Sequence, residues 1–292
     1  MLLYFQDQAG AARALANAAG LACHCVDVHR FPDGEVKLRL PHQLSARVTV
    51  FRSLHHPNEK LVELLLLART ARTLGAVHLT LVAPYLAYMR QDMAFMPGEA
   101  VSQRIIGAFL ASLFDAVITV DPHLHRVATL AEAMPMEHAI VLTGAAPLSD
   151  LVVKLKDRPL LIGPDEESGQ WVALAADRHG LDFAVCRKVR SGDRDVAVAL
   201  PDVQVSGRAV VIMDDVASTG NTLAAAARLL HSAGAVSIDA AVTHALFDNG
   251  AIDTIRSAGV GQIWSTDCIA HATNTVSMAP LIAQALTEMF AN

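Results

Sequence analysis

Short apolar runs, each followed by a polar turn and a stretch of helix-forming residues, recur along most of the chain. Apolar runs bounded by Gly, Pro or charged residues are typical of buried strands, and longer stretches with spaced apolar residues are typical of helices. The pattern predicts strands at 2–5, 22–28, 48–51, 78–83, 116–120, 160–162, 183–186, 210–213, 238–243 and 263–264. It predicts helices at 11–19, 58–74, 102–114, 171–179, 223–230, 251–257 and 279–290.

The alternation of strands and helices predicts the α/β class. Because the second half repeats the order of the first, we expect two doubly wound parallel-sheet domains, related by internal duplication, with a cleft between them. We place the first domain at 1–142 and the second at 143–278. The last helix, within 279–292, is expected to pack back on the first domain.

Two segments of the first half have no regular period. Phe31-Pro-Asp-Gly-Glu35 precedes alternating apolar and basic residues, for which a hairpin is the simplest interpretation. Residues 85–99 connect a strand to a helix, and loops of that length are usually functional or disordered. Their mixture of aromatic, Arg, Gln and Asp residues favours contacts with an adenine and with phosphates. Ser102 is expected to cap the helix that follows.

The stretch 208–223 carries the clearest chemistry. An apolar run leads into an acidic pair and a small polar turn, after which helix formers begin; the polar group is Asp214, Asp215, Ser218, Thr219 and Thr222 around Gly220. Gly220 permits backbone conformations closed to other residues, and a turn at a helix start favours an anion. Carboxylates accept from sugar hydroxyls, so the group predicts a ribose phosphate site. An ordinary helix cap needs only one such residue, and the absence of Lys after Gly220 excludes a nucleotide triphosphate P-loop.

Composition narrows the class of protein. A formal net charge of −6 over 292 residues argues against nucleic-acid binding. The N-terminus lacks a basic signal-peptide region and no apolar run is long enough to cross a bilayer, so we expect a cytoplasmic protein without a membrane partner. Cys23 and Cys25 flank His24, but the next Cys is Cys186, so we expect buried strand thiols and no metal site there.

The pattern Asp214-Asp215-x-x-Ser218-Thr219-Gly220-x-Thr222 resembles the loop that binds 5-phosphoribosyl 1-diphosphate (PRPP) in the type I phosphoribosyltransferase superfamily. Further segments occur in the order and spacing of ribose-phosphate pyrophosphokinases (PRPP synthetases). They are 31–35, 90–92 with 97–99, 120–123, 163–165, 188–190, 243–247 and 277–281. No single motif is decisive, but the ordered combination is specific and covers nearly the whole chain.

The resemblance implies phosphoribosyltransferase-type domains and an enzyme that transfers the diphosphoryl group of Mg-ATP to the 1-hydroxyl of ribose 5-phosphate, giving PRPP and AMP. Mg²⁺ is the implied cofactor. A catalytically silent regulatory homologue would be expected to lose the cationic or magnesium residues, which are present. A PRPP-using phosphoribosyltransferase would share the 214–222 loop but has no need for 90–92 or 120–123.

The resemblance also assigns residues to roles. Lys188 and Arg190 correspond to catalytic cations, which on an extended segment face the same way; without the resemblance, a solvated basic loop is the alternative. His123, also placed in the catalytic set, and Asp165 correspond to magnesium-site residues, with Asp121 orienting His123 or a magnesium-bound water. The ATP-binding residues are Arg90, Gln91 and Asp92 and, from a neighbouring subunit, Phe31, Asp33 and Glu35. The ribose-5-phosphate-binding residues are Asp214, Asp215, Ser218, Thr219, Gly220, Asn221 and Thr222.

A site shared between subunits implies a homo-oligomer, at least a dimer. His125 receives no role. The sequence departs from longer family members at 95–99, at Ser218 and at 166–168, and the chain is short. These departures resemble compact members that lack strong control by phosphate and ADP.

Overall fold

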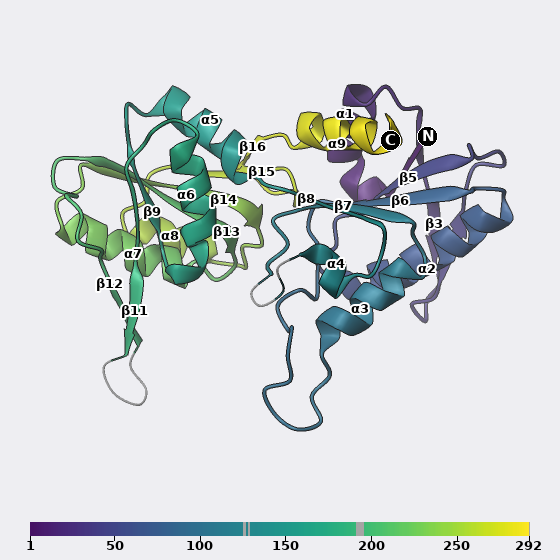
Figure 1. Ribbon diagram of the computed structural model, residues 1–292, viewed down its shortest axis with the longest axis horizontal. Helices are drawn as coiled ribbons and strands as arrows, with labels where there is room; N and C mark the ends of the chain where they lie inside the picture. The colour runs from purple at the N-terminus through teal and green to yellow at the C-terminus, as the bar shows by residue number, and fades with distance from the viewer. Residues whose placement is uncertain (125–126, 128, 191–195, 292) are drawn as a thin grey trace. The chain divides into compact units, whose positions relative to one another are not determined.

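The computed structural model describes residues 1–124, 127, 129–190 and 196–291. The chain divides into two compact units (Figure 1). Unit 1 comprises Met1–Leu142 and Met278–Asn292, and unit 2 comprises Thr143–Ser277. No helix among these residues is both long and apolar enough to span a bilayer.

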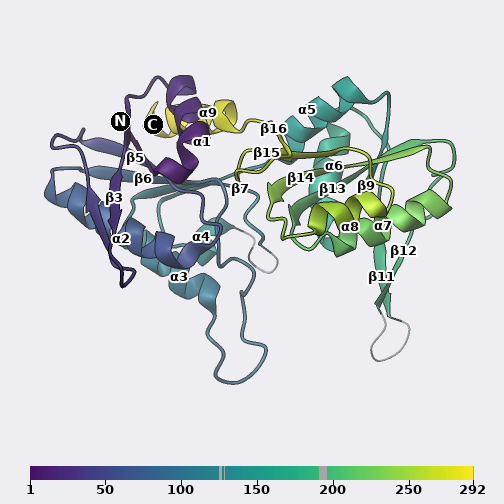
Figure 2. The same cartoon turned by 180° about the vertical axis from the view of Figure 1, so that it is seen from behind.

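Unit 1 is built on a six-stranded parallel sheet with the order β2-β1-β5-β6-β7-β8. Its strands are β1 (Leu2–Tyr4), β2 (Cys23–Cys25), β5 (Arg47–Phe51), β6 (His78–Ala83), β7 (Ala116–Val120) and β8 (His138–Leu142). Its helices are η1 (Gln6–Gln8), α1 (Ala9–Ala18), α2 (Pro57–Thr73), α3 (Ser102–Ala111), α4 (Leu130–Ala133) and α9 (Ala279–Ala291). Helices α1 and α9 cover one face of the sheet, and α2 and α3 cover the other (Figures 1 and 2).

Unit 2 repeats this architecture with the strand order β10-β9-β13-β14-β15-β16, again parallel. Its strands are β9 (Leu160–Gly163), β10 (Phe183–Val185), β13 (Ala209–Ala217), β14 (Ser237–Ala245), β15 (Ile263–Thr266) and β16 (Asn274–Val276). Its helices are α5 (Ala145–Leu155), η2 (Glu166–Ser168), α6 (Gly169–Asp177), α7 (Asn221–Ser232) and α8 (Ala251–Ser257). Helices α5 and α6 lie on the face of the sheet opposite α7 and α8 (Figures 1 and 2).

Each unit also carries an antiparallel hairpin. In the chain it comes between β2 and β5 in unit 1 and between β10 and β13 in unit 2. The hairpins are β3 (Asp27–Arg30) with β4 (Val36–Arg39) and β11 (Arg187–Arg190) with β12 (Val196–Ala199). The two units share their strand order, their hairpin and the helices around the sheet, which confirms two domains of one α/β type; α4 has no counterpart among the described residues of unit 2. Helix α5 follows β8 in the chain but packs on α6 of unit 2, whereas α9 follows β16 but packs on α1 of unit 1. Each repeat thus contributes its last helix to the other unit.

The sheets are buried on both faces because strand residues alternate between two apolar layers. In unit 2, Val210 and Ile212 pack beneath α7 and α8, whereas Val211 and Met213 pack beneath α5 and α6. In unit 1, Val48 and Val50 pack beneath α2 in the same way. Both faces of each central strand are therefore buried, which explains why those strands are mostly apolar; in unit 1 the exceptions are the buried Thr49, Thr80 and Thr119.

Several expectations about elements were wrong. The strand expected at 22–28 is two strands, because after Val26 the chain leaves the sheet to pair with β4. Cys23 is half-buried and Cys25 exposed, since β2 is an edge strand rather than a buried one. Ser102 is the first residue of α3 and not its cap; its Oγ donates to Gln91 Oε1 at 3.2 Å. Strand β8 and helix α5 were not expected at all.

Candidate functional site

The central feature of unit 2 is the connection between β13 and α7. The acidic pair lies within β13, which continues to Ala217, four residues beyond the strand expected at 210–213. Asp214 and Asp215 are adjacent on β13, and their side chains hydrogen-bond to one another. Asp214 is half-buried and Asp215 is 3% exposed, and the Asp215 amide donates to Asp214 Oδ1 at 3.0 Å. Asp214 is therefore the accessible carboxylate of the pair.

The turn itself comprises residues 218–220, and α7 begins at Asn221. Gly220 is the N-cap with φ +75°, a left-handed conformation, and a Cβ on it would stand 2.7 Å from Ile255 Cγ1. Only glycine satisfies both demands. Thr219 Oγ1 accepts from the Asn221 amide at 3.4 Å, so the polar residues of the turn are gathered around the start of the helix, where free amides favour an anion.

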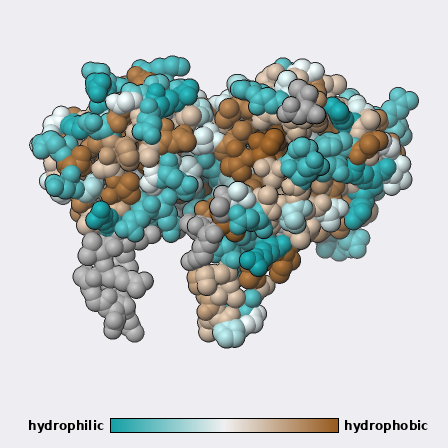
Figure 3. All heavy atoms as spheres, in the orientation of Figure 1, coloured by the Kyte–Doolittle hydropathy of each residue, from teal (hydrophilic) through white to brown (hydrophobic). Residues whose placement is uncertain are grey.

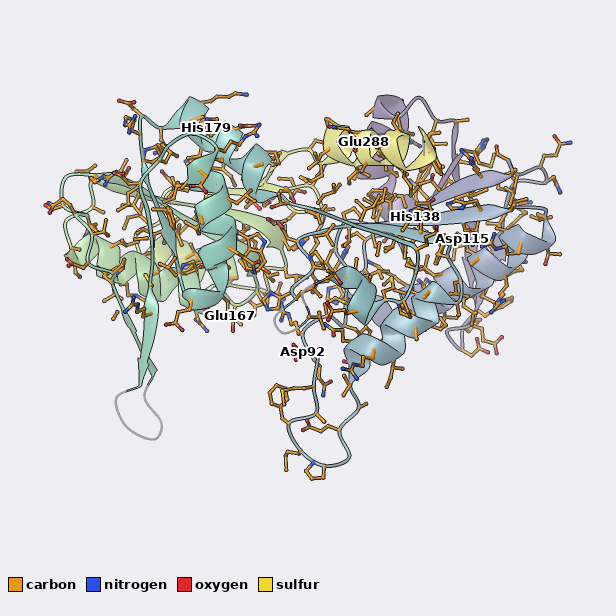
Figure 4. The ribbon with its side chains drawn as sticks, viewed as in Figure 1. Asp92, Asp115, His138, Glu167, His179 and Glu288 are labelled. Atoms are coloured by element: carbon orange, nitrogen blue, oxygen red, sulfur yellow. The ribbon has the colours of Figure 1, made fainter. Side chains whose placement is uncertain are left out.

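A third carboxylate lies beside the acidic pair. Strand β9 runs parallel to β13 and ends at Gly163, and Asp165 then caps η2 by accepting from the amides of Glu167 and Ser168 at 3.2 and 3.4 Å. Figure 4 places Glu167 beside this carboxyl-end edge of unit 2. Burial raises the pKa of Asp214 well above its usual range, and the nearby carboxylates of Asp215 and Asp165 raise it further. The structure thus gathers all three carboxylates where β9 and β13 end.

In unit 1 the segment 90–92 leaves the end of β6 without regular structure. It is fixed to the start of α3, because the Gln103 amide donates to the Gln91 carbonyl at 3.2 Å and Gln103 Nε2 donates to the Met89 carbonyl at 3.1 Å. Asp92 is 7% exposed at the base of the loop (Figure 4), whereas Arg90 is exposed. The loop beyond it projects from unit 1 with Phe95 and Met96 exposed (Figure 3).

His123 follows β7, the strand next to β6, so it lies at the same edge of the sheet as segment 90–92. Asp121 adopts φ +37°, an uncommon conformation for a residue other than Gly, and its amide donates to the Leu142 carbonyl at 2.9 Å. His123 is partly exposed and Asp121 buried. His125 lies outside the described residues.

The Pro-Asp-Gly segment is the tip of the β3–β4 hairpin, as its turn residues predicted. Asp33 Oδ1 accepts from the Glu35 amide at 3.1 Å, and Gly34 has φ +94°. Phe31, Asp33 and Glu35 are exposed, and Phe31 packs edge-on against His29 with ring centroids 4.7 Å apart. The backbone of the tip is held by hydrogen bonds within the turn, and its side chains are exposed to solvent.

Lys188 and Arg190 both lie on β11, paired with Val198 and Val196 of β12. An extended backbone places residues two apart on one side of the strand, so the predicted geometry of the segment is confirmed at the level of the backbone. The side chains of these two residues, and residues 191–195, lie outside the described part of the chain.

Sequence reasoning missed a charged cluster at the carboxyl end of β5 in unit 1. Arg52 is 3% exposed and its Nη1 and Nη2 lie 2.5 Å from Asp7 Oδ1 and Glu63 Oε2. Lys60 is 7% exposed nearby. A signal was present, because Arg52 directly follows an apolar run and precedes a helix that starts with Pro57. That order repeats the strand, polar turn and helix of 210–223.

Comparison with known proteins agrees with this architecture. Residues 1–113 match the family model of the N-terminal domain of ribose phosphate pyrophosphokinase, and residues 148–256 match that of the phosphoribosyl transferase domain. The chain is 35% identical over 268 residues to the ribose-phosphate pyrophosphokinase of Methanopyrus kandleri, covering 90% of each chain. It is 34% identical over 273 residues to ribose-phosphate pyrophosphokinase 2 of Archaeoglobus fulgidus, covering 94% of this chain and 95% of the relative.

Among solved structures, the phosphoribosylpyrophosphate synthetase from Mycobacterium smegmatis superposes with a TM-score of 0.86 at 23% identity, over 100% of this chain and 99% of that one. That likeness supports the fold. The matches to these two relatives cover 90% and 94% of this chain, so the similarity extends through both units. The chain belongs to the ribose-phosphate pyrophosphokinase family.

Proposed function

We propose that the chain transfers the diphosphoryl group of Mg-ATP to ribose 5-phosphate, giving PRPP and AMP. In that reaction the 1-hydroxyl oxygen of the sugar forms a bond to the β-phosphorus. The bond from the β-phosphorus to the α,β-bridging oxygen breaks, AMP leaves, and the hydroxyl proton is released. The observation that carries the proposal is the β13–α7 connection, with Asp214 and Gly220 in place, in a chain of this family.

Ribose 5-phosphate would bind at that connection. The start of α7 and the hydroxyls of Ser218, Thr219 and Thr222 suit a phosphate monoester, because amide and hydroxyl donors converge there. The Asp214 carboxylate suits the sugar diol, and Asp215, which is buried, would hold the strand end in position. Asn221 opens the helix and completes the phosphate contacts in this proposal.

ATP would bind through residues at the end of β6 and through a hairpin tip from another copy of the chain. Arg90 supplies positive charge for phosphates, while Gln91 and Asp92 are held by their position beside α3. Lys188 and Arg190 on β11 would neutralise the charge that develops on the transferring group. Phosphoryl transfer depends mainly on such positioning and charge neutralisation.

Magnesium fits the residues of unit 2. Mg²⁺ usually keeps several waters and binds one or two carboxylates together with substrate phosphates, so a dedicated cage is unnecessary. Among the described residues no cluster of three or more His, Cys, Asp or Glu side chains forms such a cage. The crowded carboxylates around Asp214 would be relieved by a cation. Asp165 in unit 2 and His123 in unit 1 are the residues that we propose as magnesium ligands, each described within its own unit, and the ion would supply charge neutralisation at the phosphates.

The exposed tip of the β3–β4 hairpin supports a homo-oligomeric assembly. Phe31, Asp33 and Glu35 face solvent while their turn backbone is fixed by hydrogen bonds. We propose that they complete the ATP site of a neighbouring copy, so that the active form is at least a dimer.

The proposal is tested by mixing the pure protein with Mg-ATP and ribose 5-phosphate and following the products by phosphorus NMR. AMP and PRPP should appear in equal amounts. ADP in place of AMP would show single phosphoryl transfer and overturn the reaction type. If PRPP is instead consumed when a nucleobase is added, the chain acts as a phosphoribosyltransferase.

Lys188→Ala and Arg190→Ala should each lower kcat by about 10²-fold or more, because each removes a cation that acts in the transition state. Circular dichroism should show an unchanged fold, since β11 lies on a hairpin outside the main sheet. Unchanged turnover in both variants would remove the proposed role of this strand.

A further inference from the structure

The carboxyl edge of the unit 1 sheet holds a cavity of about 710 Å³. It lies where β1 and β5 end, and the chain passes from β1 to β2 on one side and from β5 to β6 on the other. Such a reversal of strand order is the usual position of a ligand crevice in an open α/β sheet. In unit 2 the corresponding strands are β9 and β13, whose ends carry the proposed ribose 5-phosphate site. The cavity therefore occupies the duplicated counterpart of that site.

Strand register identifies the residues that correspond. Val50 pairs with Leu3 and packs beneath α2, and Ile212 pairs with Ile162 and packs beneath α7. Two residues further along each strand stand Arg52 in unit 1 and Asp214 in unit 2. The helices that follow also correspond, since each is preceded by a residue in the left-handed conformation, His56 with φ +51° and Gly220 with φ +75°. The left-handed residue before the helix is thus shared, while the charge two residues beyond the paired position is reversed.

The buried part of the cavity wall carries more cations than carboxylates. Arg52, Lys60 and Glu63 are 3%, 7% and 1% exposed. Lys60 Nζ donates to the Ser53 carbonyl at 2.9 Å and lies 3.4 Å from His55 Nδ1, and it has no ion pair among the described residues. Burial, and then the neighbouring Arg52, lowers the pKa of Lys60 to about 8.

Arg52 keeps donor capacity that its protein partners do not use. Its Nη atoms contact Asp7 and Glu63, but its Nε has no hydrogen-bond partner in the described structure. The guanidinium also lies over the Phe5 ring, 4.2 Å from its centroid, and a buried donor without a partner costs free energy. Asp7 and Glu59, the other carboxylates of the wall, are 52% and 75% exposed at their side chains, so solvent screens them.

We propose that this cavity binds a phosphate group, with Arg52 and Lys60 as its charged contacts and the amides at the start of α2 as additional donors. Helix α2 begins at Pro57 in the wall of the cavity, so its first free amides lie beside the two cations. Where the unit 2 loop presents a carboxylate to a sugar diol, unit 1 presents a guanidinium to an oxyanion. The phosphate can be free orthophosphate or the phosphate of a sugar phosphate.

Phosphate must be tested with the unit 2 loop blocked, because that loop also suits phosphate. Thr222→Asp places a carboxylate in the first turn of α7, which favours the helix but repels an anion. In this background, titration calorimetry with inorganic phosphate should show binding that responds to charge changes in the cavity wall. Ribose 5-phosphate and unphosphorylated ribose are titrated in the same way. Inorganic phosphate and ribose 5-phosphate should bind, and ribose should not.

Two charge changes in the wall should move the affinity in opposite directions. Asn58→Asp adds a carboxylate at an exposed wall position where Tyr88 OH donates to Asn58 Oδ1, an acceptor that Asp retains. It should weaken phosphate binding by about fivefold or more, whereas Asp7→Asn should strengthen it by about threefold. Asn17→Asp, on the exposed side of α1, is the matched control and should leave binding unchanged.

The outcomes separate this site from the proposed reaction, because binding is measured without turnover. Binding of ribose 5-phosphate alone, weakened by Asn58→Asp, would identify a sugar phosphate as the source. Absence of phosphate and ribose 5-phosphate binding in the Thr222→Asp background would overturn the proposal. Equal effects of Asn58→Asp and Asn17→Asp would also overturn it, since they would indicate a response to net charge alone. Thermal melts of each variant check that the fold is retained.

Discussion

The environment of the Asp214 carboxyl group destabilises its ionised form. Burial and two neighbouring carboxylates raise its pKa, so its ionised form destabilises the folded state above that pKa. Below the unfolded pKa of about 3.9 the group is protonated in both states, and this cost is absent. The cost therefore appears as pH rises from about 4 through the folded pKa.

Asp214→Asn should consequently raise Tm at pH 7.5, and the difference from the wild type should shrink as pH falls toward 4. A gain of about 1 kcal/mol corresponds to roughly 2–4 °C in a protein of this size. The same change should raise KM for ribose 5-phosphate about tenfold or more, while KM for ATP changes little. Calorimetry and steady-state kinetics measure the two effects.

The exposed Asp253 on α8 supplies the matched control. Asp253→Asn should stay within about 0.5 kcal/mol of the wild type. A fall in Tm for Asp214→Asn at every pH would mean that the carboxylate supports the fold instead of straining it. A defect confined to ATP would contradict the diol assignment.

Gly220 is constrained twice, by its positive φ and by its contact with Ile255. Gly180 also has positive φ, +60°, but a Cβ there would meet nothing within 4 Å. Gly180→Ala should therefore cost only about 1 kcal/mol, and Gly220→Ala about 2–4 kcal/mol. Denaturant unfolding measures both, and Ile255→Val should recover part of the loss in the Gly220→Ala background. Equal losses at the two glycines would show that the contact with Ile255 is unimportant.

At the scale of elements, apolar runs predicted the central strands well because a parallel sheet is buried on both faces. Edge strands were less predictable: β8 exposes Val141 and His138, and its pattern is correspondingly weak. The split of 22–28 depended on a partner, β4, that local sequence does not reveal.

For the candidate site, too, local residue types were informative, whereas features that depend on distant partners were not. Residue types around Gly220 predicted a polar turn before a helix, and the structure has one. The length of β13 was not predictable from its apolar run, because the strand continues through two aspartates whose backbone pairs with β14 as far as Ala217. The cluster around Arg52 was missed because Asp7, on η1, is far from Arg52, Lys60 and Glu63 in the chain, and the local signal at Arg52 was not used.

Helix α9 provides an element-scale prediction. Leu286 is 2% exposed on it, and Phe290 packs edge-on against His78 with centroids 5.9 Å apart. Leu286→Ala should lower the free energy of unfolding by about 2–5 kcal/mol, and hydrogen exchange should lose protection in α1 and α9 but not in α7.

The half-exposed Leu174 on α6 is the control for this change, and Leu174→Ala should cost about 0.5 kcal/mol or less. Equal loss of protection in unit 2 after Leu286→Ala would contradict the assignment of α9 to unit 1.

At the scale of the whole molecule, the exposed hairpin tip predicts complementation between subunits. Phe31→Ala should impair the ATP site of a neighbouring copy, and Asp214→Asn should impair the sugar site of its own copy. In randomly mixed dimers of the two variants, half of the molecules carry one intact site, so about a quarter of wild-type activity should return when ribose 5-phosphate is kept well below the raised KM of Asp214→Asn. The two variants are unfolded, mixed and refolded together, and the activity of the mixture is then measured. No return of activity would indicate that each chain completes its own ATP site.

The exchange of terminal helices between repeats has a consequence during synthesis on the ribosome. Residues 143–277 emerge as an uninterrupted stretch that contains every helix and strand of unit 2, including α5. Unit 1, although its strands are translated first, leaves α1 uncovered until the final codons deliver α9. Domains usually mature in the order of translation; here the later-translated one is complete first, and a nascent chain stalled before residue 279 presents an apolar α1 surface to chaperones.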